Sequence, residues 1–491
     1  MSFTNQSGDL GTFTEVVPAS VGFQAPERSS ILTQRRRVRV STQTGQSYPS
    51  ALGGSGAGGA QIQFLVADQG GLLDCSSMVI NYTIQTTGTT VGPDDGHPFS
   101  TFQVLLNGQL IEQLTNASKL ANVEMTAGGS KTYYSTAGSL QGFELLNNDL
   151  VTDVPSSSVT ASITAWGYAA GNQASISTRA QRASNIIFNN VAGEQRSIPL
   201  GLICGFGRMK QYLPISVLGE VAIQIVCGSA ADVLFTTSST TTGDYSLAQV
   251  SLEYDIVVPS TAYMNVLQQV AMTDERGLLM PYESSIVAPA AAIAASSSAL
   301  LQSDLIVSRA TNNLLRATVV QIPQTLTSSL NYPSQSCFSH GGVVSLQYRI
   351  GSQVYPQIAA QGDASLFNMT LAAYGSVMQE NGTVTNRVLW GNSTNGATAG
   401  TAAVYETAQV ASGGSVKFAY ADRFTPTYGF QTVKGEAQPL AVDGVSLAGA
   451  SGSQLIASII SAPSVAYTPF VILTALRFIK AQGGGVQVIG A

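Results

Sequence analysis

The residues in this 491-residue chain best suited to binding chemistry are four arginines within five positions, Arg35, Arg36, Arg37 and Arg39. Guanidinium groups this close repel one another unless they are solvated or neutralised, and their N–H donors suit phosphate and carboxylate oxygens. Two interpretations follow. The cluster contacts phosphates of nucleic acid or acidic lipid head groups, or Arg35, Arg37 and Arg39 form one face of an edge strand and meet carboxylates of a neighbouring subunit. If all four arginines engaged duplex phosphates, binding would weaken with log salt at a slope of about −3.6.

Other segments that resemble catalytic or phosphate-binding motifs lack the required residues. The segment Thr126–Thr132 looks superficially like a phosphate-binding loop, but Ser130 stands where a glycine must precede Lys131. The acidic residues before His97 lie between two prolines, which is typical of an exposed turn. His340 has no nucleophile-elbow serine or cysteine beside it. We therefore predict no catalytic residues and expect that the protein is not an enzyme.

The cysteines and histidines form no metal-binding pattern. No pair of cysteines has the CxxC spacing, and the chain contains only two histidines. The opening Met-Ser-Phe-Thr-Asn lacks the basic start and apolar core of a secretory signal, so we expect synthesis in a reducing cytoplasm. The four cysteines are Cys75, Cys204, Cys227 and Cys337. We predict no metal and no cofactor.

The composition favours an all-β protein that associates with itself. Hydrophobic residues make up 44% of the chain and charged residues only 10%, against about a quarter in typical soluble domains. Helix-forming charged residues are scarce, and β-branched residues recur between clusters of Gly, Ser and Asn, as expected of short strands joined by turns. So few charges give little repulsion between copies, and the net charge of −6 is mild.

Two distant stretches, Thr101–Gln113 and Ser345–Gln357, show the same hairpin pattern. Asn107-Gly108 suits a type I′ turn and Gly351-Ser352 a type II′ turn. Treating both turns as two-residue loops predicts these cross-strand pairs: Val104 with Ile111 and Leu105 with Leu110 in the first hairpin, Tyr348 with Tyr355 and Arg349 with Val354 in the second. The chain therefore looks like a duplicated β domain.

The order of segments supports this duplication. We expect an N-terminal arm and flexible link over residues 1–60, a first jelly roll over 61–259, a joining helix or linker over 260–276, and a second jelly roll with a C-terminal tail over 277–491. Strand-like runs outside the hairpins include 62–67, 77–83, 159–167, 184–189, 213–226, 249–258, 283–287, 304–307, 315–322 and 415–420. The uncharged stretch 455–476 is interrupted by Pro463 and Pro469, so we interpret it as part of two buried strands and not as a membrane span.

Several short motifs resemble those of the double jelly-roll major capsid proteins of double-stranded DNA viruses, in particular the polinton-like virus and virophage type of the tectivirus–adenovirus lineage. The most specific is Tyr348–Pro356, an apolar strand followed by Arg-Ile-Gly, a short turn and Tyr-Pro. The segments Ile198–Gly201, Tyr212–Pro214 and Leu218-Gly219 are also similar to the family. The likeness covers residues 61 to about 485 in layout.

The resemblance implies two tandem eight-stranded jelly rolls with short helices and long loop insertions. It also implies a homotrimer of pseudo-hexagonal outline that assembles, with penton and minor capsid proteins, into an icosahedral virion shell. The N-terminal arm would contact neighbouring trimers, the genome or an internal membrane. The alternative function is a carbohydrate-binding or adhesive β-sandwich of a fibre or cell surface, which predicts an export signal and an aromatic sugar platform.

Overall fold

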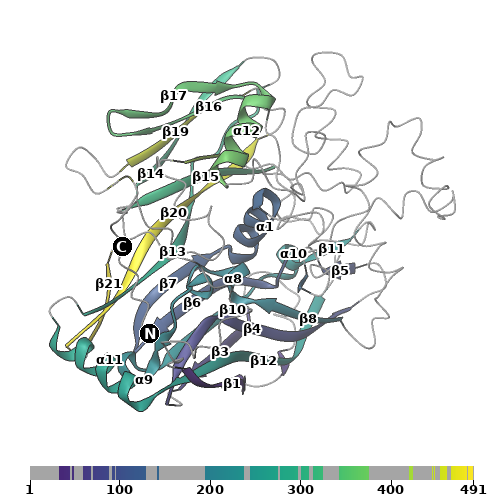
Figure 1. The fold of residues 1–491 in the computed structure, drawn as a ribbon. Helices are drawn as coiled ribbons and strands as arrows, with labels where there is room; N and C mark the ends of the chain where they lie inside the picture. The colour runs from purple at the N-terminus through teal and green to yellow at the C-terminus, as the bar shows by residue number, and fades with distance from the viewer. Residues whose placement is uncertain are drawn as a thin grey trace, which may run out of the picture.

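The computed structural model shows a mostly β protein made of two stacked units (Figure 1). It describes residues 32–44, 47–48, 59–67, 70–87, 91–93, 96–128, 141–142, 194–236, 244–274, 277–296, 300–308, 313–323, 342–374, 420–423, 445, 447, 454–461, 466–483 and 485–489. The predicted strands at 159–167 and 184–189 lie outside these residues, as does most of the one at 415–420.

The first unit is a sandwich of two antiparallel sheets. One sheet has the strand order β1-β12-β4-β8 and the other has the order β3-β10-β6-β7. The strands are β1 (Leu32–Ser41), β3 (Gln61–Val66), β4 (Leu72–Thr87), β6 (Phe99–Leu106), β7 (Gln109–Thr115), β8 (Glu194–Pro199), β10 (Val221–Cys227) and β12 (Asp244–Pro259). Short strands β2 (Ser47–Tyr48) and β9 (Leu213–Pro214) extend the first sheet, and β5 (Val91–Pro93) pairs with β11 (Leu234–Thr236).

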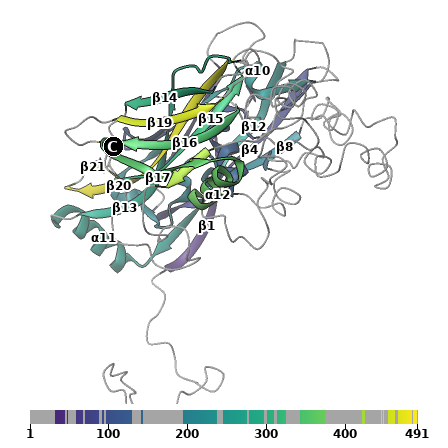
Figure 2. The same ribbon diagram turned by 90° about the horizontal axis from the view of Figure 1, so that it is seen from above.

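The second unit repeats this arrangement. Its sheets have the orders β13-β20-β15-β18 and β14-β19-β16-β17, and the strands of the latter lie side by side in Figure 2. The strands are β13 (Leu278–Pro289), β14 (Leu301–Ser308), β15 (Leu314–Pro323), β16 (Val343–Ile350), β17 (Gln353–Gln361), β18 (Tyr420–Arg423), β19 (Gln454–Ser461) and β20 (Tyr467–Gln482). A further strand, β21 (Gly485–Ile489), pairs with β20 and was not predicted from the sequence.

The two units have the same strand order, which confirms the duplicated jelly roll. When the eight main strands of each unit are numbered in chain order, both units pair them 1-8-3-6 in one sheet and 2-7-4-5 in the other. Each unit also has a helix directly after its fifth strand, α1 (Ala117–Gly128) and α12 (Asp363–Ala373). This is the double-sheet jelly-roll arrangement.

The N-terminal boundary differs from the one expected. The sequence assigned residues 1–60 to an arm, whereas Leu32–Ser41 forms the first strand of the first jelly roll, in the position that β13 holds in the second. Four charges in five residues obscured this strand. Its inward face carries Val38 and Val40, which pack against the core, so the alternation of a half-buried strand is present between the arginines.

The turns of both hairpins are as predicted, but the strand pairing of the first hairpin differs from the prediction at one position. Asn107 and Gly108 have positive φ angles of 49° and 76°, as a type I′ turn requires, and Gly351 has a φ of 59°. Leu105 pairs with Leu110, but a bulge makes Val104 pair with Glu112 and not with Ile111. The second hairpin has both predicted pairs, Tyr348 with Tyr355 and Arg349 with Val354.

Shorter elements connect these strands. The predicted joining helix is α11 (Thr261–Thr273), which Ser260 precedes. The strand-like run at 213–226, which contains Pro214 and whose length predicts two strands with a turn near Leu218-Gly219, forms β9, α9 (Ile215–Leu218) and β10. The stretch 455–476 lies in β19 and β20, as expected of two strands. The remaining short helices are α8 (Leu200–Ile203), the 3-10 helix η2 (Phe206–Arg208) and α10 (Ala230–Val233). Among the described helices, none is long and apolar enough to cross a membrane.

The second jelly roll shares one of its sheets with the core of the first. The inward face of β13-β20-β15 packs in the second core, where Val319, Val471 and Leu473 are buried. The opposite face of the same sheet belongs to the larger core of the first unit through Tyr282, Val320 and other residues. The strand β20 is therefore buried on both faces, which explains its almost continuous apolar sequence.

A buried ionic cluster crosses this seam between the two jelly rolls. Glu124 on α1 accepts a hydrogen bond of 2.6 Å from Nη2 of Arg316 on β15, and it also pairs with Arg208 on η2 at 3.4 Å. The guanidinium carbon of Arg316 lies 3.9 Å from the ring centroid of Tyr374, at the end of α12. Only 5% of the Arg316 side chain is exposed, so its charge depends on these partners.

A second polar contact holds the segment of the first jelly roll that passes close to β13 of the second. Glu112 on β7, which is 1% exposed, accepts hydrogen bonds from the backbone N–H groups of Gly205 (3.2 Å) and Phe206 (2.9 Å). A Cβ atom on Gly205 would lie 1.3 Å from the carbonyl oxygen of Glu283 on β13. Only glycine at position 205 permits these two segments of the chain to pass at this distance.

Candidate functional site: the arginine strand

The four predicted site residues lie on β1, at the edge of the first sheet. The strand pairs antiparallel with β12 over Leu32–Ser41. Arg35, Arg37 and Arg39 alternate along the outward face, with exposed side-chain fractions of 60%, 56% and 62%. Arg36 lies on the other face, which carries Val38 and Val40 and is partly buried. The predicted division of the arginines between two faces follows from the two-residue period of a strand.

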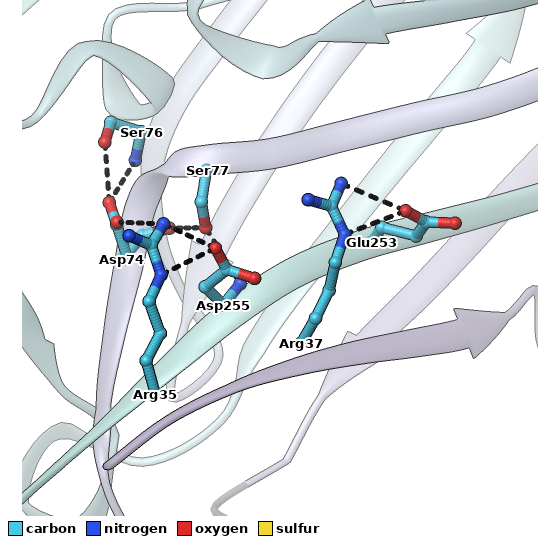
Figure 3. Close-up of polar contacts among 7 residues, drawn as sticks. All are labelled: Arg35, Arg37, Asp74, Ser76, Ser77, Glu253 and Asp255. Atoms are coloured by element: carbon cyan, nitrogen blue, oxygen red, sulfur yellow. Dashed lines mark hydrogen bonds and ion pairs between the residues drawn. The ribbon is translucent and has the colours of Figure 1, made fainter. Parts of the chain in front are cut away.

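Arg35 binds two aspartates of the same chain (Figure 3). Its Nε atom donates to Oδ2 of Asp255 on β12 at 2.9 Å, and its Nη2 atom lies 3.5 Å from Oδ2 of Asp74 on β4. The hydrogen bond to Asp255 and that carboxylate's charge raise the pKa of Arg35 above its ordinary value. Ser76 holds Asp74 through its backbone N–H (3.1 Å) and its hydroxyl (2.6 Å). Ser77 Oγ accepts from the backbone N–H of Asp255 at 2.8 Å.

The other two outward arginines continue this ladder. Arg37 donates from Nε to Oε2 of Glu253 at 3.0 Å (Figure 3), and Arg39 donates from Nε to Oγ of Ser251 at 3.1 Å. Each arginine contacts the residue diagonal to its direct partner, since Arg37 pairs in register with Asp255 and Arg39 with Glu253. Long side chains leaning along the strand reach such diagonal neighbours. We use the name arginine ladder for the following residues of β1, β4 and β12: Arg35, Arg37, Arg39, Asp74, Ser251, Glu253 and Asp255.

The arginine ladder balances its own charge. Three guanidinium groups face three carboxylates, those of Asp74, Glu253 and Asp255, and all six belong to one chain. Contact of these arginines with carboxylates of a neighbouring subunit stays a prediction, and the structure shows that carboxylates of the same chain already pair with Arg35 and Arg37. The aspartate and glutamate on β12 were the missed partners. A signal for them was present, because two acidic residues alternate with the apolar residues that predicted this strand.

We expect this neutral ladder to bind duplex DNA weakly and with little salt dependence. The slope of log affinity against log salt should be much shallower than about −3.6, because in-chain carboxylates already neutralise the charge of the guanidinium groups. Fluorescence anisotropy with a labelled duplex over a range of KCl concentrations measures the slope. A variant with Asp74→Asn, Glu253→Gln and Asp255→Asn releases the arginines and should steepen it. A wild-type slope near −3.6 would contradict the expectation.

The other candidate residues that the structure describes do not converge on a site. His97 is buried, 2% exposed, and not on an exposed turn as predicted. Its ring stacks on Phe99 with centroids 5.2 Å apart. Burial lowers the pKa of His97 to about 3, so the imidazole is neutral. Cys75, Cys204 and Cys227 are buried thiols, and no three His, Cys, Asp or Glu residues within the described ranges are grouped to hold a metal. His340, Lys131 and Cys337 lie outside those ranges.

Two solved structures share the fold over nearly the whole chain. One is the crystal structure of VP54 from PBCV-1 fitted into a cryo-EM reconstruction of the virophage Sputnik. It has a TM-score of 0.54 and 10% identity, over 96% of this chain and 99% of that one. The other is a quasi-atomic model of the PBCV-1 virus capsid, with a TM-score of 0.51, 10% identity and the same coverage. No protein-family model and no curated protein sequence matches the chain. The structural likeness confirms the predicted fold class: this chain is a double jelly-roll protein.

Proposed function

We propose that this protein is a major capsid protein whose copies form trimers that tile an icosahedral virion shell. The observation that carries the proposal is the repetition of one strand order twice in a single chain, 1-8-3-6 and 2-7-4-5. Three such chains place six equivalent units around an axis and give a trimer a pseudo-hexagonal outline. The similarity to the two PBCV-1 structures supports this role over the carbohydrate-binding alternative.

A charge-free sheet face supports association between copies. In β3, β10, β6 and β7 the single charged residue is Glu112, which is buried. A row of four glutamines in register crosses the outward face of this sheet: Gln63, Gln224, Gln103 and Gln113. Glutamine side chains donate and accept hydrogen bonds without a desolvated charge, so such a face can be covered by another protein surface at modest cost.

The proposed partners are therefore other copies of the chain, first within a trimer and then between trimers. Penton and minor capsid proteins would complete the shell. Contact with the genome or an internal membrane through the N-terminal region remains part of the proposal, but the pairing within the arginine ladder favours a protein contact for Arg35, Arg37 and Arg39. The role is structural and requires no cofactor.

The purified chain is expected to sediment as a trimer at micromolar concentration. Analytical ultracentrifugation over a concentration series measures the state, and electron microscopy of assembled particles shows whether the trimers form a shell. A monodisperse monomer throughout the series, with no particles, would refute the capsid function.

A further inference from the structure

The fifth strand of each jelly roll carries a bulge a few residues after its hairpin turn. In the first hairpin Leu105 pairs with Leu110 and Val104 with Glu112, which leaves Ile111 as the extra residue on β7. In the second, Tyr348 pairs with Tyr355 and Leu346 with Ala360, so residues 356–359 of β17 bulge opposite Gln347. The side-chain amide of Gln347 donates to the carbonyl oxygens of Pro356 (3.0 Å) and Gln357 (3.3 Å) and holds this bulge.

The bulge of β7 is one of the points where the first jelly roll contacts the second. Tyr282 on β13 donates from its hydroxyl to the carbonyl oxygen of Ile111 at 2.8 Å. Tyr282 is 2% exposed and Ile111 is 1% exposed, so this contact is buried in the seam. Since β13 is the first strand of its unit, the seam joins a fifth-strand bulge to the outer face of a first strand.

The other fifth-strand bulge, on β17, and the outer face of the other first strand, β1, are both exposed. The bulge of β17 presents Ile358, whose residue exposure of 85% is the largest among the exposed large hydrophobic residues described. The first strand of the first jelly roll is β1, and its outer face is the arginine ladder, with arginine side chains 56–62% exposed. One fifth-strand bulge and one first-strand face are thus buried against each other within the chain, and the other bulge and the other face are exposed.

We propose that the β17 bulge of one copy docks on the arginine ladder of a second copy and repeats between chains the contact that β7 and β13 make within one. The inference rests on the proposed trimer and names its contact surfaces. Because the two surfaces differ, the contact is head-to-tail, and such contacts form a closed ring when the rotation between copies closes. With three chains, each bulge contacts the ladder of the next chain and the ring of six jelly rolls is closed.

The chemistry of the two surfaces is compatible with this docking. Covering a charge is costly unless it is paired, and the ladder arginines already have carboxylate or hydroxyl partners. Guanidinium groups carry five N–H donors each, so donors remain for a second acceptor. Gln357 and Gln361 on β17 are exposed, and their side-chain oxygens are neutral acceptors beside the apolar Ile358.

The first test compares two isoleucine substitutions in the same sheet. Ile358→Lys places a cation against the ladder arginines in the proposed contact, whereas the control Ile306→Lys alters a 51% exposed position on β14, outside it. We expect Ile358→Lys to raise the trimer dissociation constant about 10–100-fold in sedimentation equilibrium, with an unchanged melting temperature for the monomer. Ile306→Lys should sediment as the wild type does. Wild-type trimer stability in Ile358→Lys would overturn the inference.

The second test identifies the partner surface by cross-linking. In a Cys337→Ser background, the double variant Ile358→Cys, Arg37→Cys should form disulfide-linked trimers under mild oxidation, while either single variant should stay unlinked. Linked dimers from Ile358→Cys alone would show that two β17 bulges meet and would overturn the head-to-tail contact. A wild-type trimer without these cross-links refutes only this inference, whereas a wild-type monomer refutes the proposed function itself.

Discussion

Replacing Glu124 with alanine is expected to lower the free energy of unfolding by roughly 3–5 kcal/mol, the cost of removing one member of a buried ion pair. The reason is that Arg316, only 5% exposed, would retain a charge at the seam without its carboxylate. Urea unfolding followed by circular dichroism measures the change. Glu253→Ala is the matched control, because Glu253 pairs with the largely exposed Arg37 and its loss should cost at most about 1 kcal/mol.

The uncompensated charge, and not the lost contact, should cause most of this effect. The double variant Glu124→Leu, Arg316→Met removes both charges and fills a similar volume, so we expect it to recover much of the lost stability. If the double variant is less stable than Glu124→Ala, the explanation by an unpaired charge is wrong, and packing around Tyr374 is the larger contribution.

The effect should also depend on pH in a defined direction. Burial raises the pKa of Glu124, but Arg316 and Arg208 outweigh burial, so the pKa lies below its ordinary value. A lowered folded-state pKa contributes stability that is full above the unfolded pKa of about 4.3 and is lost as the pH falls through the folded value. The deficit of Glu124→Ala should therefore shrink in acid.

Glu112 is expected to act in the opposite direction. Burial is the largest influence and raises its pKa, although the backbone N–H groups of Phe206 and Gly205 oppose the shift. The stability linked to this raised pKa is present below the unfolded value and is lost as the pH rises through the folded one. Only the comparison of Glu124→Ala with the wild type isolates the Glu124 contribution.

Gly205→Ala is expected to destabilise the protein by about 3 kcal/mol or more, at the upper end of overpacking effects. The added Cβ would meet the Glu283 carbonyl oxygen at 1.3 Å, and backbone atoms cannot move aside as a flexible side chain can. The seam would have to open locally, which would also strain the two hydrogen bonds to Glu112. Thermal unfolding by calorimetry measures the loss.

Gly485→Ala is the matched control for this substitution. A Cβ at Gly485 would approach the Gln482 carbonyl oxygen no closer than 3.6 Å, an ordinary contact. We therefore expect its melting temperature to be unchanged or slightly raised, because alanine reduces the freedom of the unfolded chain. Equal melting temperatures for Gly205→Ala and the wild type would show that the seam is not as tightly packed as the structure indicates.

Local chemistry made much of the fold predictable from the sequence. The turn at Asn107-Gly108 follows from the low cost of positive φ at these residues, and strand alternation separated Arg36 from the outward arginines. Such signals arise where the conformation of a residue depends only on its neighbours in sequence. The bulge at Ile111 carries none, because its carbonyl oxygen is positioned by Tyr282, 171 residues away.

The sequence by itself determined that two similar sets of strands follow one another and that the protein is a double jelly roll. Only the tertiary structure decided that the arginine strand completes the first jelly roll, that Asp255, 220 residues from Arg35, neutralises it, and that Glu124 and Arg316 meet at the seam. The physical reason is that backbone propensity and hydrophobic period act over a few residues, whereas charges pair with whatever the fold brings within a few ångströms.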